Sequence, residues 1–305
     1  MVNEMCSVAA RRRGDQMLGT ASRVDRWLLV EQPGPWGPPA VPTGRMDPDV
    51  ARHIIALAAA ANARLLLVRR PGGRSLSGGR QVFVVDSRPG QERQLTATVS
   101  GEEQLPMLTL PLGAGVPADP PWSEVGAPLL LVCTHGRHDQ CCAIWGRPVA
   151  AALAAVRPHQ TWECSHVGGD RFAANVVMLP HGLYFGDVSP GDAVALADAM
   201  DSGAVPPALL RGRSSLSVVG QAAQQYARLD LRRDRLEDLL PSRQEQTGPN
   251  SWRVLLRGAH EPDVEVEVLY DRAGEGGPAL LTCGAQESKV APVFRLLSLR
   301  VMSPL

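Results

Sequence analysis

The most chemically distinctive part of the sequence is a stretch rich in cysteine and histidine in its middle third. Cys133 begins the run Cys-Thr-His-Gly-Arg-His-Asp-Gln-Cys-Cys, which ends with Cys141 and Cys142. A second run, Cys-Ser-His-Val-Gly-Gly-Asp, starts at Cys164. Soft thiolates combined with imidazole nitrogen are the ligands that suit zinc or an iron-sulfur cluster. The two runs therefore predict a metal or cluster site.

Both runs are expected where strands of an α/β fold end. The apolar residues 129–133 predict a strand, 146–156 predict a helix and 161–166 predict a second strand. Sites collect at such strand ends, so a compact β-α-β unit should bring the two runs together. Gly168 and Gly169 lie in the turn that ends the second run. They would let the backbone pass close to a bulky inorganic core without a Cβ clash.

The spacing of these residues resembles that of the sucrase/ferredoxin-like family, whose domain is similar to the thioredoxin-like [2Fe-2S] ferredoxins. The likeness is plain over residues 128–188 and weaker over nearly the whole chain. The family pattern is Cys-x8-Cys followed by His-x-Gly-Gly-His, and two cysteines and two histidines hold the cluster. Cys133 and Cys142 have the first spacing, and His166 opens the second motif. The resemblance thus implies a [2Fe-2S] cofactor bound by these three residues.

The fourth ligand is open, because Asp170 stands where the family pattern has its second histidine. A carboxylate is a hard oxygen ligand and is unusual on iron-sulfur clusters. Cys164 lies two residues before His166, on the same face of a strand, and is chemically the better ligand. Cys141 is a third candidate, which could replace Cys142 or remain a buried spectator.

The function that the resemblance implies is electron transfer, either as a simple carrier or as the ferredoxin component of a reductase system with a redox partner protein. Histidine ligation lowers the negative charge of the site and raises its reduction potential. A ligating imidazole can also lose its second proton, so the potential should depend on pH. The word "sucrase" implies no glycoside hydrolysis, since the sequence shows no carboxylate pair for it.

Two other function classes remain open. One is a thiol-based redox enzyme without iron that uses Cys141, Cys142 or Cys164, although the sequence has no Cys-x-x-Cys motif. The other is a zinc-binding or metal-free interaction module, which Asp170 would favour if the cluster had been lost.

The amino-acid composition limits the kinds of partner that the protein is expected to bind. The 305 residues include 31 basic and 31 acidic side chains, and 4% of the residues are aromatic. Nucleic acid is not expected as a partner, because phosphate binding needs clustered cationic charge. The longest apolar runs, 54–61 and 149–156, are far shorter than the roughly 20 residues of a membrane span. With no secretory signal and six cysteines, we expect a cytoplasmic protein with free thiols.

The chain is expected to be an α/β protein in three regions. Residues 1–115 form an N-terminal α/β half, 120–205 a thioredoxin-like [2Fe-2S] ferredoxin domain, and 206–305 an appendage of helices and antiparallel strands. The first half should contain a strand at 27–31, a helix from Asp47 to about 63, and strands at 64–70, 81–87 and 94–100. The appendage should contain one or two helices over 214–240 and strands from 252 onwards, among them the alternating run Val-Glu-Val-Glu-Val.

The first two regions read as a diverged duplication. Residues 27–31 match 129–133, and the Pro-Gly-Gly turn within 70–74 matches the Val-Gly-Gly turn within 166–170. Any α/β unit whose strands end in glycine turns would also show this pattern. In place of the ligand residues, the first half has Glu31, Arg70 and Arg74.

We expect mainly structural roles for the cysteines, histidines and other polar residues outside the motif. Cys6 and Cys283 are expected to be structural or incidental. His135 and His138, with Arg137, are interpreted as exposed loop polarity, with hydrogen bonding to cluster sulfides as the alternative. Arg171 and Asn175 could support the ligands from behind.

Overall fold

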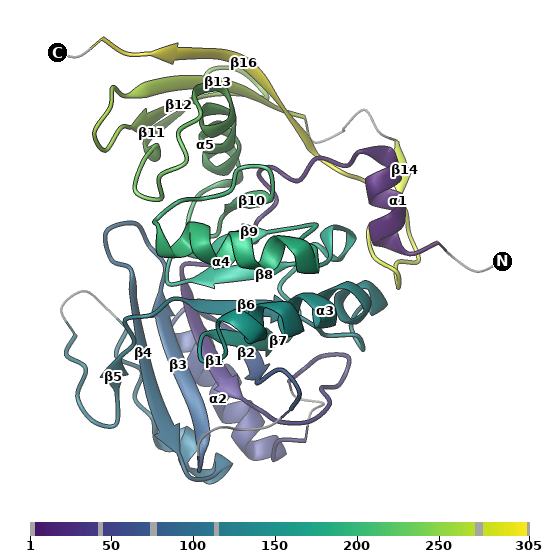
Figure 1. The fold of residues 1–305 in the computed structure, drawn as a ribbon, viewed down its shortest axis with the longest axis vertical. Coiled ribbons are helices and arrows are strands. Elements are labelled where there is room, and N and C mark those ends of the chain that lie inside the picture. Colours follow the sequence, from purple (N-terminus) through teal and green to yellow (C-terminus); the bar gives the residue numbers. More distant parts are fainter. Residues whose placement is uncertain (1–3, 42–44, 74–77, 113–115, 272–276, 304–305) are drawn as a thin grey trace.

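A computed structural model describes residues 4–41, 45–73, 78–112, 116–271 and 277–303 of the chain. Its centre is a ten-stranded mixed sheet, and a four-stranded antiparallel sheet lies at one end (Figure 1). The strands of the central sheet are β1 (Arg26–Glu31), β2 (Ala63–Arg69), β3 (Arg80–Asp86), β4 (Arg93–Val99), β5 (Ser123–Glu124), β6 (Leu129–Cys133), β7 (Thr161–Cys164), β8 (Val176–Leu179), β9 (Leu183–Phe185) and β10 (Leu210–Arg213). Their spatial order is β10-β9-β8-β6-β7-β2-β1-β3-β4-β5.

The two halves of the central sheet have the same connectivity. In the first half, β1 and β2 are parallel and joined by helix α2 (Pro48–Ala60), while β3 and β4 follow as antiparallel strands beside β1. In the second half, α3 (Gln140–Val156) joins the parallel strands β6 and β7, and β8 and β9 follow beside β6. This order is thioredoxin-like, and a duplication would leave such a pair of units.

The halves meet where β2 pairs antiparallel with β7. Val68 lies opposite Cys164, and Arg69 opposite Glu163. A single sheet therefore runs through both expected regions, and the boundary between 115 and 120 stays a prediction. Of the residues matched between the halves, Arg74 lies outside the described residues.

Helices α2 and α3 each begin where an aspartate side chain caps the backbone. Asp47 accepts hydrogen bonds from the backbone N–H groups of Asp49 and Val50, and Pro48 occupies the first turn of α2, as expected. The predicted start of α3 at residue 146 is wrong. Asp139 accepts the backbone N–H of Cys141 at 2.9 Å, so α3 begins at Gln140, six residues earlier, and carries Cys141 and Cys142 in its first turn.

The remaining short elements pack around the central sheet. Figure 1 shows helix α4 lying over β8 and β9. These elements are α1 (Cys6–Arg13), the 3-10 turns η1 (Glu102–Met107), η2 (Asp170–Phe172) and η3 (Pro190–Asp192), α4 (Ala193–Asp201), and the two-stranded hairpin of β14 (Pro278–Ala279) and β15 (Lys289–Val290). Helix α1 lies beside β14, so the N-terminal helix and this C-terminal hairpin are neighbours (Figure 1).

The C-terminal region is one helix packed on one sheet. The sheet order is β11-β12-β13-β16, and the valines of the alternating run face α5, because Val264, Val266 and Val268 are buried in its core. A single helix fills the segment where one or two were expected, and β11 was not foreseen. The elements are α5 (Val218–Leu231), β11 (Leu240–Gln246), β12 (Ser251–Arg257), β13 (Val264–Asp271) and β16 (Val293–Val301).

No helix in the described ranges combines the length and the apolar character needed to cross a membrane.

Candidate metal centre

Three of the predicted ligands meet where β6 ends and α3 begins. The sulfurs of Cys133 and Cys142 and a ring nitrogen of His166 all lie within 4.8 Å of one another. Asp170 joins them from the start of η2: its Oδ1 lies 2.9 Å from His166 Nδ1 and accepts a hydrogen bond from the Cys142 thiol at 3.2 Å. We call these four residues the Cys/His group.

Burial and charge prepare this group for a cation. Cys133, Cys142 and Asp170 are almost fully buried, whereas the His166 side chain is 22% exposed. Hydrogen bonding with Cys142 lowers the pKa of the Cys133 thiol well below its usual value, despite the opposing effect of burial. The same contact, together with burial, raises the pKa of Cys142. One thiolate is thus already favoured in the metal-free protein, and it shares its neighbour's proton.

The ion pair between His166 and Asp170 is also reflected in their pKa values. Burial lowers the pKa of His166, but contact with Asp170 and with the Cys133 sulfur outweighs it and raises the pKa to about 9. Burial raises the pKa of Asp170, but contact with His166 outweighs it and the pKa lies below its ordinary value. Without a metal, a protonated imidazole therefore lies between a thiolate and a carboxylate and offsets one of their two negative charges.

His138 lies beside the Cys/His group, which the sequence pattern did not indicate. Its ring stacks on that of His166, with ring centroids 3.6 Å apart, and its Nε2 lies 3.9 Å from Asp170 Oδ2. His138, His166 and Asp170 form a second trio whose ligand atoms lie within 4.8 Å of one another. The available signal was its place in the loop between the two cysteines. His138 is thus a neighbour of the site as well as an exposed loop residue.

His135 has a different role, because it is buried and fixes the loop after β7. Its Nδ1 accepts the backbone N–H of His166 at 3.4 Å, which leaves Nε2 to donate to the carbonyl of Gly37 at 2.7 Å. Trp36 packs edge-on against the ring. The interpretation of His135 as an exposed polar residue is therefore wrong: it positions the ligand loop from the interior.

The glycines of the turn adopt positive φ angles, +98° at Gly168 and +81° at Gly169. A Cβ at Gly168 would lie 2.6 Å from Ser22 Oγ, and one at Gly169 would lie 2.3 Å from Arg211 Nη2. The glycines therefore make room for protein atoms, and their contact with a cofactor stays a prediction.

Arg211 is a buried cation beneath this turn that the sequence did not reveal. It donates to the carbonyl of Gly168 at 2.9 Å and to Asn175 Oδ1 at 2.7 Å, and Asn175 in turn donates to the carbonyl of Gly169 at 2.9 Å. Burial lowers the pKa of Arg211 to about 10. Asn175 supports the turn, as expected. Arg171 instead forms an ion pair with Asp15, which follows α1, with Nε and Oδ2 3.2 Å apart.

The other two candidates for the fourth ligand lie elsewhere. Cys164 is fully buried in the apolar core next to Cys133 across the β6–β7 pair, and burial raises its pKa well above the usual value. Among the described residues, it belongs to no set of three or more mutually close ligand atoms. Cys141 points into a separate cluster with Cys6, Asp139 and Cys283. Asp170 is therefore the candidate that contacts the other ligands.

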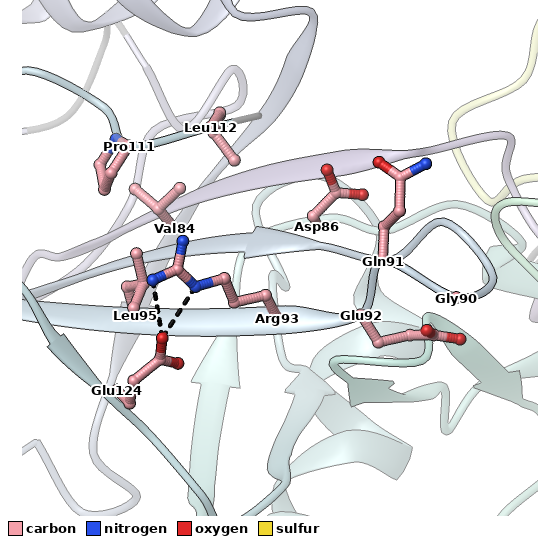
Figure 2. Close-up of a pocket in the computed structure, with 10 residues that line it drawn as sticks. All are labelled: Val84, Asp86, Gly90, Gln91, Glu92, Arg93, Leu95, Pro111, Leu112 and Glu124. Atoms are coloured by element: carbon pink, nitrogen blue, oxygen red, sulfur yellow. Dashed lines mark hydrogen bonds and ion pairs between the residues drawn. The ribbon is translucent and has the colours of Figure 1, made fainter. Parts of the chain in front are cut away.

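A separate surface pocket of about 470 Å³ lies over β3 and β4 (Figure 2). It is lined by ten residues from 84 to 124, none of them cysteine or histidine, and the charge of Arg93 is neutralised there by Glu124 at 2.7 Å. Its carboxylates include Glu92, which pairs with Arg213, and Glu124, so the pocket does not combine thiol and imidazole ligands as the Cys/His group does.

The fold and the site together define a thioredoxin-like α/β protein with a buried thiol, imidazole and carboxylate group suited to a metal. Residues 17–212, well over half of the chain, match the sucrase/ferredoxin-like family. The chain therefore belongs to that family. Comparison with curated proteins finds no match.

Solved structures of the thioredoxin-like [2Fe-2S] ferredoxin from Aquifex aeolicus are similar to part of the chain. One is 20% identical, with a TM-score of 0.26, and covers 30% of this chain and 94% of the ferredoxin. Two cysteine-to-serine variants of that ferredoxin are 20% and 21% identical, with TM-scores of 0.24 and 0.25 and coverage of 28% of this chain and 97% of theirs.

Proposed function

We propose that the protein is an electron carrier that binds one [2Fe-2S] cluster through Cys133, Cys142, His166 and Asp170. The observation that carries the proposal is that the donor atoms of Cys133, Cys142 and His166 meet at the end of β6, while Asp170 contacts both Cys142 and His166. Two thiols and an imidazole are established ligands of such clusters. When bound, the cluster would take up and release one electron at a time.

The chain's own residues prepare the site in three ways. The lowered pKa of Cys133 makes a thiolate available for a metal. His135 and Arg211 hold the turn that carries His166 and Asp170. The core around the two cysteines keeps water away from the sulfurs, because both side chains are about 1% exposed.

Electrons would enter or leave on the histidine side of the group. The side chain of His138 is 38% exposed and that of His166 is 22% exposed, whereas the cysteines and Asp170 are buried. We infer that a redox partner protein, such as a reductase or an electron acceptor, docks over these two rings. A reducing compartment such as the cytoplasm suits the protein, since all six cysteines are free.

A thiol-based redox enzyme is a poorer explanation of the same residues. Its nucleophile must reach a substrate disulfide, but Cys141, Cys142 and Cys164 are at most 1% exposed. The burial that hinders thiol exchange is compatible with electron transfer to a cluster, which needs no atomic contact between the reactants.

The test is anaerobic purification followed by a visible spectrum, assays of iron and acid-labile sulfide, and EPR after dithionite reduction. We expect two irons and two sulfides per chain. Cys133→Ser should remove the colour, whereas Cys164→Ser should leave the spectrum unchanged, since Asp170 supplies the fourth ligand. A wild-type protein without iron even after reconstitution would refute the cluster, and loss of colour in Cys164→Ser would refute the role of Asp170.

A further inference from the structure

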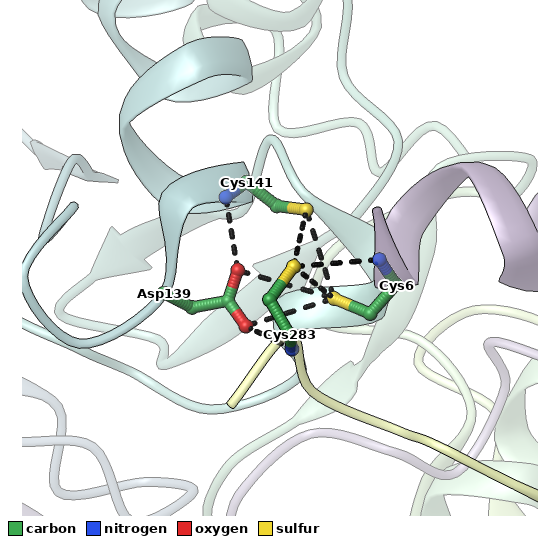
Figure 3. A group of neighbouring side chains, drawn as sticks. All are labelled: Cys6, Asp139, Cys141 and Cys283. Carbon is green, nitrogen blue, oxygen red and sulfur yellow. Dashed lines mark hydrogen bonds between the residues drawn. The ribbon is translucent and has the colours of Figure 1, made fainter. Parts of the chain in front are cut away.

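A second group of cysteines lies outside the Cys/His group and has no part in the proposed function. Cys6 comes from the start of α1, Cys141 from the first turn of α3 and Cys283 from the loop between β14 and β15, and Figure 3 shows their sulfurs facing one another. Asp139, the cap of α3, completes the set. We call these four residues the tri-cysteine group.

The sulfurs form a nearly equilateral triangle. The Sγ atoms of Cys6 and Cys141 are 3.6 Å apart, those of Cys141 and Cys283 are 3.4 Å apart, and those of Cys6 and Cys283 are 3.5 Å apart. The Asp139 carboxylate lies over one edge, with Oδ2 3.7 Å from the Cys6 sulfur, and all four ligand atoms are within 4.8 Å of one another.

These distances match the edges of a tetrahedral zinc site. With Zn–S bonds of about 2.3 Å, two sulfurs on one tetrahedral ion are separated by about 3.8 Å. The three Sγ–Sγ separations in the structure are 0.2–0.4 Å shorter than this value. A small outward movement of the thiols would therefore admit the ion without a rearrangement of the backbone.

Two helix N-termini and two hydrogen-bond donors lie beside the sulfurs. Cys6 and Cys141 each lie in the first turn of a helix, where the positive end of the helix dipole stabilises negative charge. The hydroxyl of Ser7 donates to the Cys141 sulfur at 3.2 Å, and the backbone N–H of Cys6 donates to the Cys283 sulfur at 3.4 Å. Together these donors and dipoles offset part of the cost of burying anionic sulfur.

The carboxylate of Asp139 is oriented before any ion binds. Its Oδ1 accepts the backbone N–H of Cys141 at 2.9 Å, and its Oδ2 accepts the backbone N–H of Cys283 at 2.7 Å. Asp139 is 3% exposed, and within the described part of the chain no cationic side chain hydrogen-bonds or ion-pairs with it or with the three sulfurs. Asp139 therefore presents a buried carboxylate to the three sulfurs, and no cationic side chain among the described residues offsets its charge by direct contact.

We propose that Cys6, Cys141, Cys283 and Asp139 bind one Zn²⁺ ion as a structural site. Three thiolates and a carboxylate form a closed four-coordinate set, and zinc is the common divalent ion that prefers sulfur ligands in this geometry and does not change oxidation state. The site links three segments that are far apart in the sequence, since 277 positions separate Cys6 from Cys283.

The zinc site would hold α1 against the turn that carries Asp170. Helix α1 contacts η2, where Arg11 Nη2 donates to the carbonyl of Ala173 at 2.5 Å. Asp15, just after α1, pairs with Arg171 of the same turn. Zinc at the tri-cysteine group would therefore hold α1 against the turn beside the Cys/His group, without contacting the residues of that group.

The experiment compares metal content in the full chain and in two pairs of variants, purified anaerobically and dialysed against equimolar Zn²⁺. Native mass spectrometry and elemental analysis should find one zinc per chain in the wild type. Cys6→Ser and Cys283→Ser should each lose that zinc and keep the iron. Cys133→Ser and Cys142→Ser should lose the iron and keep one zinc, so a failure of the cluster proposal would leave this result intact.

Co²⁺ gives an independent reading in the same proteins. Loaded in place of zinc, it should show intense sulfur-to-cobalt absorption and tetrahedral visible bands, both absent in Cys283→Ser. Because Cys283 lies on a partly exposed loop, this variant is expected to fold, which circular dichroism will check. Retention of zinc in Cys283→Ser would overturn the proposal, as would a wild-type protein that binds none. A disulfide between two of the three cysteines, detected by mass after alkylation, would also overturn it.

Discussion

The two cysteine groups each take one cysteine from the first turn of α3, but their other residues come from different parts of the chain. The Cys/His group draws its residues from one β-α-β unit, and 28 positions separate Cys142 from Asp170. The tri-cysteine group draws on the N-terminal helix, α3 and the C-terminal hairpin. The first is a local motif, and the second exists only because the ends of the chain return to the middle.

The difference arises at two adjacent residues. Successive side chains on an α-helix point about 100° apart, since the helix has 3.6 residues per turn. Cys142 therefore faces the core and the Cys/His group, whereas Cys141 faces α1 and Cys283. One helix start, capped by Asp139, thus positions a ligand for each site.

The largest expected effect comes from replacing Cys141 and Cys142 by serine, one at a time, which should separate the two sites. Cys142→Ser should abolish iron and the visible spectrum while leaving zinc bound, and Cys141→Ser should abolish zinc while leaving the spectrum. The reason is that each serine removes one thiolate from one site only. Metal analysis of the two proteins measures this, and loss of both metals from both variants would show that the sites are not independent.

The next effect concerns the carboxylates. Asp170→Ala removes the proposed fourth ligand, so the affinity for the cluster should fall by at least about tenfold, measured by the rate of iron loss to a chelator. Asp170→His, which restores the histidine of the family pattern, should retain the cluster with an altered EPR spectrum. An unchanged rate in Asp170→Ala would assign the fourth position to another residue, and His138, which stacks on His166, would be tested next.

Removal of zinc should weaken the attachment of α1 and the C-terminal hairpin. If the ion is present at about 1,000 times its dissociation constant, binding contributes about 4 kcal/mol, and chelation should lower the unfolding midpoint by about 5 °C or more. Calorimetry with and without chelator measures the shift. The double variant Cys6→Ser/Cys283→Ser is the matched control, because chelation should leave its midpoint unchanged.

The histidine ligand should make the reduction potential depend on pH. Reduction favours protonation of a ligating imidazole, so above the pKa of the oxidised state the potential should fall as pH rises. Protein-film voltammetry between about pH 6 and pH 10 measures the slope. His166→Cys should flatten the curve, whereas a flat wild-type curve would argue against His166 as a ligand.

The smallest effect appears in the metal-free protein. The pKa of His166 is raised from 6.5 to about 9, so the folded chain binds the proton of this imidazole more tightly than the unfolded chain does. This stabilisation is complete below about pH 6.5 and is lost as pH rises through about 9. The unfolding midpoint of metal-free protein should therefore decline over that range, and the decline should be smaller in Asp170→Asn. Equal declines in the two proteins would show that the ion pair does not contribute.

Much of the fold could be predicted because local signals agree with it. Asp47 with Pro48 marked the start of α2, and the alternation of Val264 to Val268 predicted a strand with one buried face. The start of α3 was predicted six residues too late, at 146, whereas a single cap at Asp139 suffices to begin the helix at Gln140. Such capping depends on where the preceding loop is held.

By itself, the sequence determined the spacing of Cys133, Cys142 and His166, and with it the family, and it predicted a site of thiol and imidazole ligands. That was possible because these ligands belong to one β-α-β unit whose geometry follows from local pattern. The tertiary structure alone decided that Asp170 contacts the other ligands, that Arg211 lies beneath their turn, and that Cys6 and Cys283 meet at Cys141. Those contacts join residues up to 277 positions apart, and only the packing of whole segments specifies such distances.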